Sequence, residues 1–199
     1  MALLLSLAFT PLHIFVPVFL QRLHGFDPLA AGYTVAAASM AWTVAAIAVA
    51  GLSRRWPDRM IAAGPVAMGL GLMGLALAMP AGPVTALVPA LVLVGGGIGA
   101  CWAFTAQRIM SGARRGEGDI AASSVATVQQ VGYALGAAVA GLVANVAGFS
   151  LGGTAGMAHA AFWVPVTFGS AAGAAWLMGL RLGALSRRGG TAEPASSQS

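Results

Sequence analysis

The stretch of sequence that decides the fold is DIAASSVATVQQVGYALGAAVAGLVANVAG, which runs from Asp119 to Gly148. A helix needs about 20 residues to cross a bilayer, so this stretch can span one, and it carries no charge after Asp119. At about 100° per residue, it has an aliphatic face, a seam of two small residues (Gly132 and Gly136) and a polar face with Ser123, Thr127, Gln130 and Asn145. Lipid can accept only the aliphatic face. The seam favours a closely packed helix, and the polar face requires water, a ligand or a partner helix.

The composition of the whole chain is that of a polytopic membrane protein. Of its 199 residues, 58% are hydrophobic and only 8% are charged, whereas about a quarter of the residues in a soluble domain are charged. The net charge of +5 could suggest nucleic acid in a soluble protein, but all basic residues here are Arg in short loops, so we expect no nucleic-acid partner. The single cysteine, Cys101, lies in an apolar segment and indicates neither a disulfide nor a metal site. We therefore expect no cofactor and no metal.

Hydropathy predicts an all-α membrane protein with six transmembrane helices in one bundle over residues 1–186. The expected spans are about 2–20, 29–52, 60–79, 84–106, 120–148 and 159–182. Residues 187–199 are rich in Gly, Ser, Ala and polar residues, so they are expected to form a disordered tail.

The arginines alternate between the loops and predict the orientation of the bundle. Arg22 lies on one side of the membrane, and the other nine lie in the second and fourth loops and at the C-terminal end of the chain. Loops rich in Arg remain in the cytoplasm. We therefore expect a multi-pass protein of the plasma membrane with both termini and the tail in the cytoplasm.

Polar residues also follow one face of the first span. Ser6, Thr10, His13, Pro17 and Gln21 fall on it, and the rest of the span is aliphatic or aromatic. Such a face indicates a helix that lines a cavity. In the fourth span, Gly95, Gly99 and Trp102 share a face, which allows close backbone approach. The GGGIG run there is not a nucleotide motif, because no strand precedes it.

Four motifs in order resemble the C-terminal six-helix half of a major facilitator superfamily transporter, most closely the drug:proton antiporters with fourteen helices. They are VPVFLQ (16–21) followed by PLAAG (28–32), GLSRRWPDR (51–59), Gly95-x-Gly97-x-Gly99, and QQVGYALG (129–136). The third motif precedes a basic loop. The second is a divergent copy, since Arg54 stands where the family has an acid and Pro57 where it has glycine.

The resemblance implies half of a facilitator fold and a site. Its first and fourth helices would line the central path, and its second and fifth would flank it. The substrate-facing candidates are His13, Gln21, Trp102, Gln129, Gln130 and Tyr133. The cytoplasmic gate would involve Arg55, Asp58 and Arg59, and the helix-packing glycines would be Gly95, Gly99, Gly132 and Gly136.

The function that the resemblance implies is proton-coupled export of small, drug-like compounds by alternating access. The partners would be the lipid bilayer, the small-molecule substrate and a second six-helix half, in the same chain, in another chain or in a homodimer. No Asp, Glu, Lys or Arg lies deep in a span, and the resemblance places the coupling acid in the other half. We therefore expect that this chain alone does not complete a proton antiport cycle.

Other interpretations remain open at this point. The polar residues can simply form hydrogen bonds between helices, and His13 can serve either such a bond or a proton relay. The chain can also be a truncated fragment that does not transport, or a six-helix unit that pairs with a copy of itself. An enzyme is not expected, because Ser53, Ser111 and Ser150 have no His and acid arranged around them.

Overall fold

The chain folds into a bundle of long helices, as the hydropathy predicts. A computed structural model describes residues 1–51, 57–80, 82–112 and 118–189, and these residues contain no β-strand. Within them, six helices are long and apolar enough to cross a membrane, which confirms the predicted all-α membrane fold. The helices are α1 (Ala2–His24), α2 (Pro28–Ala50), α3 (Pro57–Ala78), α4 (Val84–Ser111), α5 (Gly118–Val146) and α6 (Gly153–Gly189), with a short 3-10 turn, η1 (Phe149–Leu151), before α6.

The helices α1, α4 and α6 extend beyond their predicted spans, and the difference is largest at α6. The first helix continues through Pro11 and Pro17 to His24 and ends at Gly25, which adopts a left-handed conformation with φ 68°. Asp27 then caps α2, since its Oδ1 accepts a hydrogen bond of 2.8 Å from the backbone N–H of Ala30. The last helix contains 37 residues, which exceeds the length that the bilayer requires. Residues 190–199, the larger part of the expected tail, lie outside the described residues.

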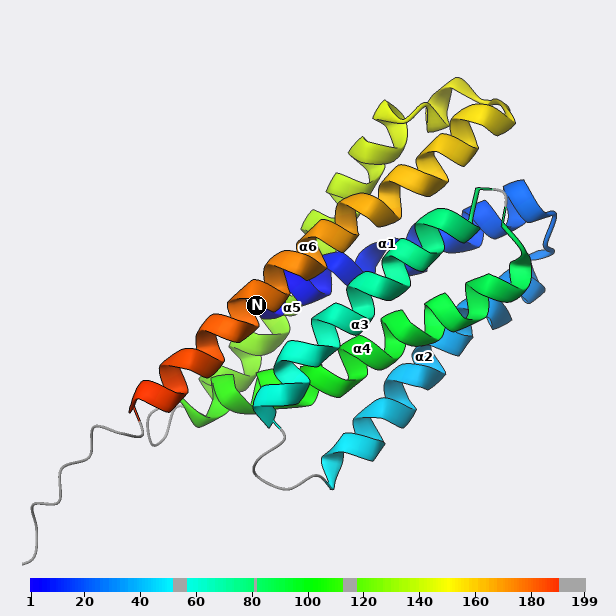
Figure 1. Cartoon of the computed structure of the whole chain (residues 1–199). Helices are drawn as coiled ribbons and strands as arrows, with labels where there is room; N and C mark the ends of the chain where they lie inside the picture. Colours follow the sequence, from blue (N-terminus) through cyan, green and yellow to red (C-terminus); the bar gives the residue numbers. More distant parts are fainter. Residues whose placement is uncertain (52–56, 81, 113–117, 190–199) are drawn as a thin grey trace, which may run out of the picture.

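The short connections after α1, α3 and α5 all lie at one end of the bundle, and the chain leaves α6 at the other end (Figure 1). Consecutive helices therefore run in opposite directions. Helices α3 and α4 pack most extensively, followed by α2 against α4, α3 against α6 and α1 against α5. The main apolar core is formed mostly by α1, α3, α4 and α6, with large buried side chains such as Phe9, Phe19, Leu72, Leu91 and Phe168.

Two helices, α2 and α5, lie at the margin of this core. In their most apolar windows only 17% of the residues are buried, against 61% in α1. The buried residues of α5 are all small and recur every fourth position: Gly132, Gly136, Ala140 and Ala144. Because positions i and i+4 lie above one another on a helix, α5 contacts the bundle through one narrow stripe and leaves its other faces free.

The glycines of α4 and α5 bring backbones together at two different interfaces. A Cβ atom on Gly132 would lie 2.7 Å from Ser6 Cβ, and one on Gly136 would lie 2.8 Å from Thr10 Cβ, so both glycines face α1. On α4, a Cβ on Gly99 would lie 2.9 Å from Trp42 Cα, and Gly95 contacts the backbone of Ala38 still more closely, so both face α2. We call the first pair the α1–α5 seam and the second the α2–α4 seam.

Candidate functional site

A groove opens between α1 and α5 beside the α1–α5 seam. It has a volume of about 550 Å³. Three of its residues come from α1 and four from α5: Thr10, His13, Ile14, Gln130, Tyr133, Ala134 and Ala137. Its position follows from the seam, because the glycines let α5 approach α1 along one stripe, and the neighbouring faces of both helices then diverge from a fixed line of contact. The structure thus brings His13, Gln130 and Tyr133 together from two helices.

On the α5 side of the groove, two polar side chains one helical turn apart form a hydrogen bond. Gln129, which is half-buried, donates a hydrogen bond of 3.1 Å from Nε2 to the hydroxyl oxygen of Tyr133. Gln129 itself does not line the groove. Gln130 is exposed and makes no hydrogen bond to another residue that the structure describes. Its amide can therefore donate to a bound molecule or accept from it.

On the α1 side, His13 packs against the first of two aromatic side chains that contact each other. Its ring stands edge-on to Phe9 with centroids 4.9 Å apart, and Phe9 packs edge-on against Trp42 of α2 at 5.0 Å. His13 is exposed to the groove, whereas Thr10 is buried. The Thr10 hydroxyl donates to the Ser6 carbonyl at 3.0 Å, so its proton is already used within α1. The α1 wall is thus largely apolar, with one imidazole at its surface.

Besides Gln129, two predicted substrate-facing residues lie outside this groove. Gln21 is half-buried near the end of α1, two turns beyond His13. Trp102 of α4 is half-buried and packs against the apolar core. Of the predicted gate, Arg55 lies outside the described residues, and the side chain of Asp58 does as well, although its backbone belongs to α3. Arg59 is exposed in the first turns of α3.

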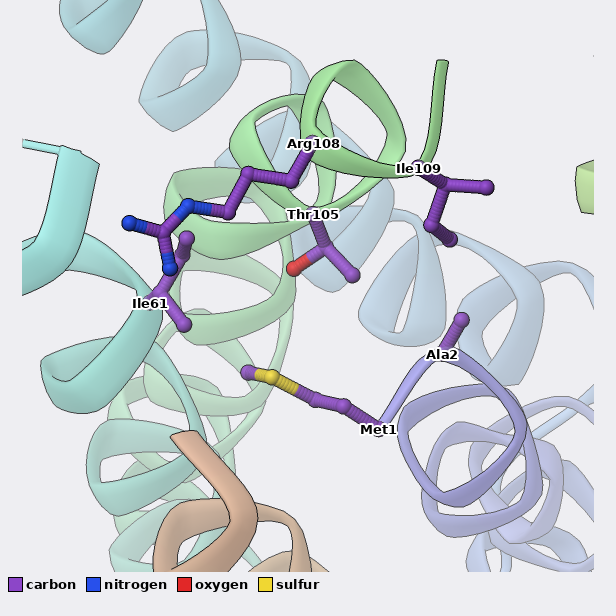
Figure 2. A pocket seen from close by; sticks show the side chains of 6 residues that line it. All are labelled: Met1, Ala2, Ile61, Thr105, Arg108 and Ile109. Carbon is purple, nitrogen blue, oxygen red and sulfur yellow. The ribbon is translucent and has the colours of Figure 1, made fainter. Parts of the chain in front are cut away.

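Two other hollows contain none of the predicted substrate-facing residues. Figure 2 shows a pocket of about 270 Å³ where α1, α3 and α4 meet, lined by Met1, Ala2, Ile61, Thr105, Arg108 and Ile109. The second, of about 470 Å³, lies between α5 and α6 and is lined mainly by aliphatic residues, His159 and Trp163. Trp163 Nε1 donates to His159 Nε2 at 2.7 Å, and His159 Nδ1 lies 3.1 Å from the Ala147 carbonyl. Both ring nitrogens of His159 therefore have partners.

Sequence reasoning missed the small and aliphatic residues of the groove, Ile14, Ala134 and Ala137. It also missed the glycines of α3. A Cβ on Gly71 would lie 2.6 Å from the Ala90 carbonyl oxygen, and Gly64 and Gly97 face each other across α3 and α4. The high content of glycine in α3 was the available signal, since small residues in a span indicate close helix packing.

The chemistry of the groove is that of an apolar wall with a few hydrogen-bonding groups. No acidic residue lines it as far as the structure describes it, and its polar groups are an imidazole, an amide, a phenol and a hydroxyl. A volume of this size accommodates a small organic molecule. Such a site can bind an amphipathic compound by apolar contact and orient it by hydrogen bonds, but it offers no fixed negative charge to a cation.

Comparison with known proteins identifies the family of the chain. Residues 1–137 match the family model of the Major Facilitator Superfamily. Two curated proteins, from two strains of Mycobacterium tuberculosis and each named a probable multidrug-efflux transporter, are 38% identical to this chain over 139 residues, which is 67% of this chain and 30% of each relative. The match thus spans less than a third of the length of these relatives. No solved structure matches the chain.

Proposed function

Because this chain belongs to the major facilitator superfamily, we propose that it forms one half of an exporter of small amphipathic compounds. The motif resemblance is thereby confirmed at the level of the family, and family membership identifies a transporter component rather than an enzyme. The observation that supports the proposal best is the groove between α1 and α5, where polar side chains from the middle of two membrane-spanning helices converge on an apolar wall. Both relatives are named probable multidrug-efflux transporters, which favours drug-like compounds as substrates.

The mechanism that we propose is alternating access, in which this bundle rocks against a second bundle. The exposed faces of α2 and α5 are the surfaces that such a bundle would cover, since both helices are buried only along one stripe. Close backbone contact at the α1–α5 and α2–α4 seams would let these helices shift without disturbing large side chains. The gate at the arginine-rich end would involve Arg55, Asp58 and Arg59, at the cytoplasmic surface of the plasma membrane.

Proton coupling, in this proposal, depends on a group outside the groove. A coupling site in a membrane usually contains a carboxylate, and the groove as described contains none. His13 contributes the imidazole of the groove, which can donate or accept a hydrogen bond. We therefore propose that His13 hydrogen-bonds the substrate and that the proton-carrying acid belongs to the second bundle.

Cysteine labelling in native membranes tests whether the groove is a water-filled path. The starting variant is Cys101→Ala, which removes the single cysteine. Ala134 lines the groove, and its neighbour Leu135 is 47% exposed but does not line it. A membrane-impermeant maleimide, added to both faces of the membrane, should label Ala134→Cys and leave Leu135→Cys unlabelled, because only the groove contains water. Equal labelling of the two variants would exclude a water-filled groove.

Efflux of Nile red, an uncharged fluorescent compound with a carbonyl group, from intact cells tests transport itself. Gln130→Leu removes a polar group of the groove, and Gln107→Leu makes the same change at the exposed end of α4. We expect the first variant to slow efflux and the second to leave it unchanged. Efflux that is present and insensitive to Gln130→Leu would show that the transport path does not use this groove.

A further inference from the structure

The hydrogen bond between Gln129 and Tyr133 fixes the direction of a proton in the groove. Gln129 Nε2 is the donor and the Tyr133 oxygen the acceptor, at 3.1 Å. The Tyr133 hydroxyl makes no other hydrogen bond to a residue that the structure describes. A phenol that accepts from one neighbour still has its own proton to donate. Because Tyr133 lines the groove and Gln129 does not, that proton is available on the groove side.

The other polar groups of the groove do not require a hydrogen-bond acceptor on the bound molecule. Gln130 carries both a carbonyl and an amino group, and the neutral imidazole of His13 has one donor and one acceptor nitrogen, so each of them can adapt to a donor or an acceptor. The Thr10 proton is committed to the Ser6 carbonyl. Tyr133 is therefore the group that discriminates between compounds with and without an acceptor. A half-buried donor left without an acceptor loses its hydrogen bond to water and gains none in return.

From these contacts we infer that Gln129 is a positioning residue that turns the hydroxyl proton of Tyr133 into the groove, where it donates to an acceptor oxygen, such as a carbonyl, of the bound compound. The inference rests on the proposed function, because it assumes that the groove binds substrate. It narrows the substrate class to amphipathic molecules that carry an oxygen acceptor and need no positive charge. It also gives Gln129, which is absent from the groove wall, a role in specificity.

The direction of the proton can be measured without any ligand. The chain has two tyrosines, Tyr33 and Tyr133, so Tyr33→Phe leaves Tyr133 as the single tyrosine. Tyr33 is 71% exposed on α2, away from the groove. The tyrosine doublet in the ultraviolet resonance Raman spectrum of this variant, in lipid vesicles, should have the intensity ratio of a hydroxyl that accepts a hydrogen bond from Gln129 and donates one to water in the groove. Gln129→Leu should abolish that signature. The opposite result is a ratio typical of a hydroxyl that only donates, to a strong acceptor, and that changes in Gln129→Leu. It would show that the proton points to Gln129 and would overturn the inference.

Binding of a matched pair of tritiated probes tests the consequence for specificity. Anthraquinone and anthracene share a three-ring frame, and only anthraquinone has carbonyl acceptors. Saturable binding to the full chain in nanodiscs, corrected for empty nanodiscs, should weaken about fivefold for anthraquinone in Tyr133→Phe, the factor of one net hydrogen bond, and stay unchanged for anthracene. Tyr33→Phe is the control and should change neither.

The role of Gln129 follows from combining the variants. Gln129→Leu and the nearly isosteric Gln129→Glu, which accepts the Tyr133 proton, should both weaken anthraquinone binding when Tyr133 is present. Neither should have an effect in the Tyr133→Phe background, because Gln129 acts through the hydroxyl. Saturable binding of both probes that Tyr133→Phe weakens equally would overturn the inference but not the proposed groove. Absence of saturable binding of either probe would overturn the groove as a binding site, and the inference with it.

Discussion

Substitution of Gly136 by alanine should weaken the bundle at the α1–α5 seam. The added Cβ would lie 2.8 Å from Thr10 Cβ and 2.9 Å from the Leu7 carbonyl oxygen, where ordinary contacts begin at 3.4 Å. The Leu7 oxygen is backbone and cannot rotate away, so α5 must move off α1 by several tenths of an ångström. Overpacking of this kind costs about 1–3 kcal/mol, which exceeds the gain of up to about 1 kcal/mol when alanine replaces glycine in a helix.

The matched control is Gly141→Ala on the same helix, since a Cβ there would have no neighbour within 4 Å. Unfolding of each variant by dodecyl sulfate in mixed micelles, followed by tryptophan fluorescence, gives the two free energies. We expect Gly136→Ala to be less stable than Gly141→Ala by about 1–3 kcal/mol. Equal stabilities would mean that α5 does not approach α1 closely, and the account of how the groove is positioned would be wrong.

Three further predictions can be tested by the same unfolding measurement or by labelling of a cysteine. Gly95→Ala should destabilise the α2–α4 seam by about 1–3 kcal/mol, whereas Gly96→Ala, where a Cβ has no neighbour, should not; equal effects would refute the seam. Asp27→Ala should cost about 1 kcal/mol by removing the cap of α2, and Asp27→Asn, which retains a capping oxygen, should restore most of it. Cys101 is fully buried against α3, so a maleimide should react with it only after unfolding; rapid labelling of the folded chain would contradict this packing.

Much of the fold could be predicted from composition and periodicity, because a bilayer permits few alternatives. Long apolar segments can only be helices there, and glycines spaced by four in a span indicate a seam. The helix that packs against each glycine pair could not be predicted. The spacing of the glycines determines the face of their own helix but not the partner helix. The structure pairs Gly132 and Gly136 with α1, and Gly95 and Gly99 with α2. The glycines Gly64 and Gly71 were overlooked because they are spaced by seven.

The candidate site was predicted less completely, for a geometric reason. His13 and Gln21 share a face on a helical wheel, but a wheel ignores height along the axis, and Gln21 lies two turns away from the groove. Trp102 has a polar nitrogen and was expected to face the path, yet its large apolar surface packs on the core. The pairing of Gln129 with Tyr133 could have been read from their separation of four, since such residues are neighbours on a helix.

The buried hydroxyls of α1 have a consequence for biosynthesis. Ser6 and Thr10 are the residues that α5 covers, but α5 is synthesised only after the intervening helices, on the order of ten seconds later at ordinary rates of translation. Both hydroxyls donate to carbonyls of their own helix, Ser6 to Ala2 and Thr10 to Ser6. At these two positions, therefore, the helix presents no unpaired hydroxyl proton to lipid before α5 covers them.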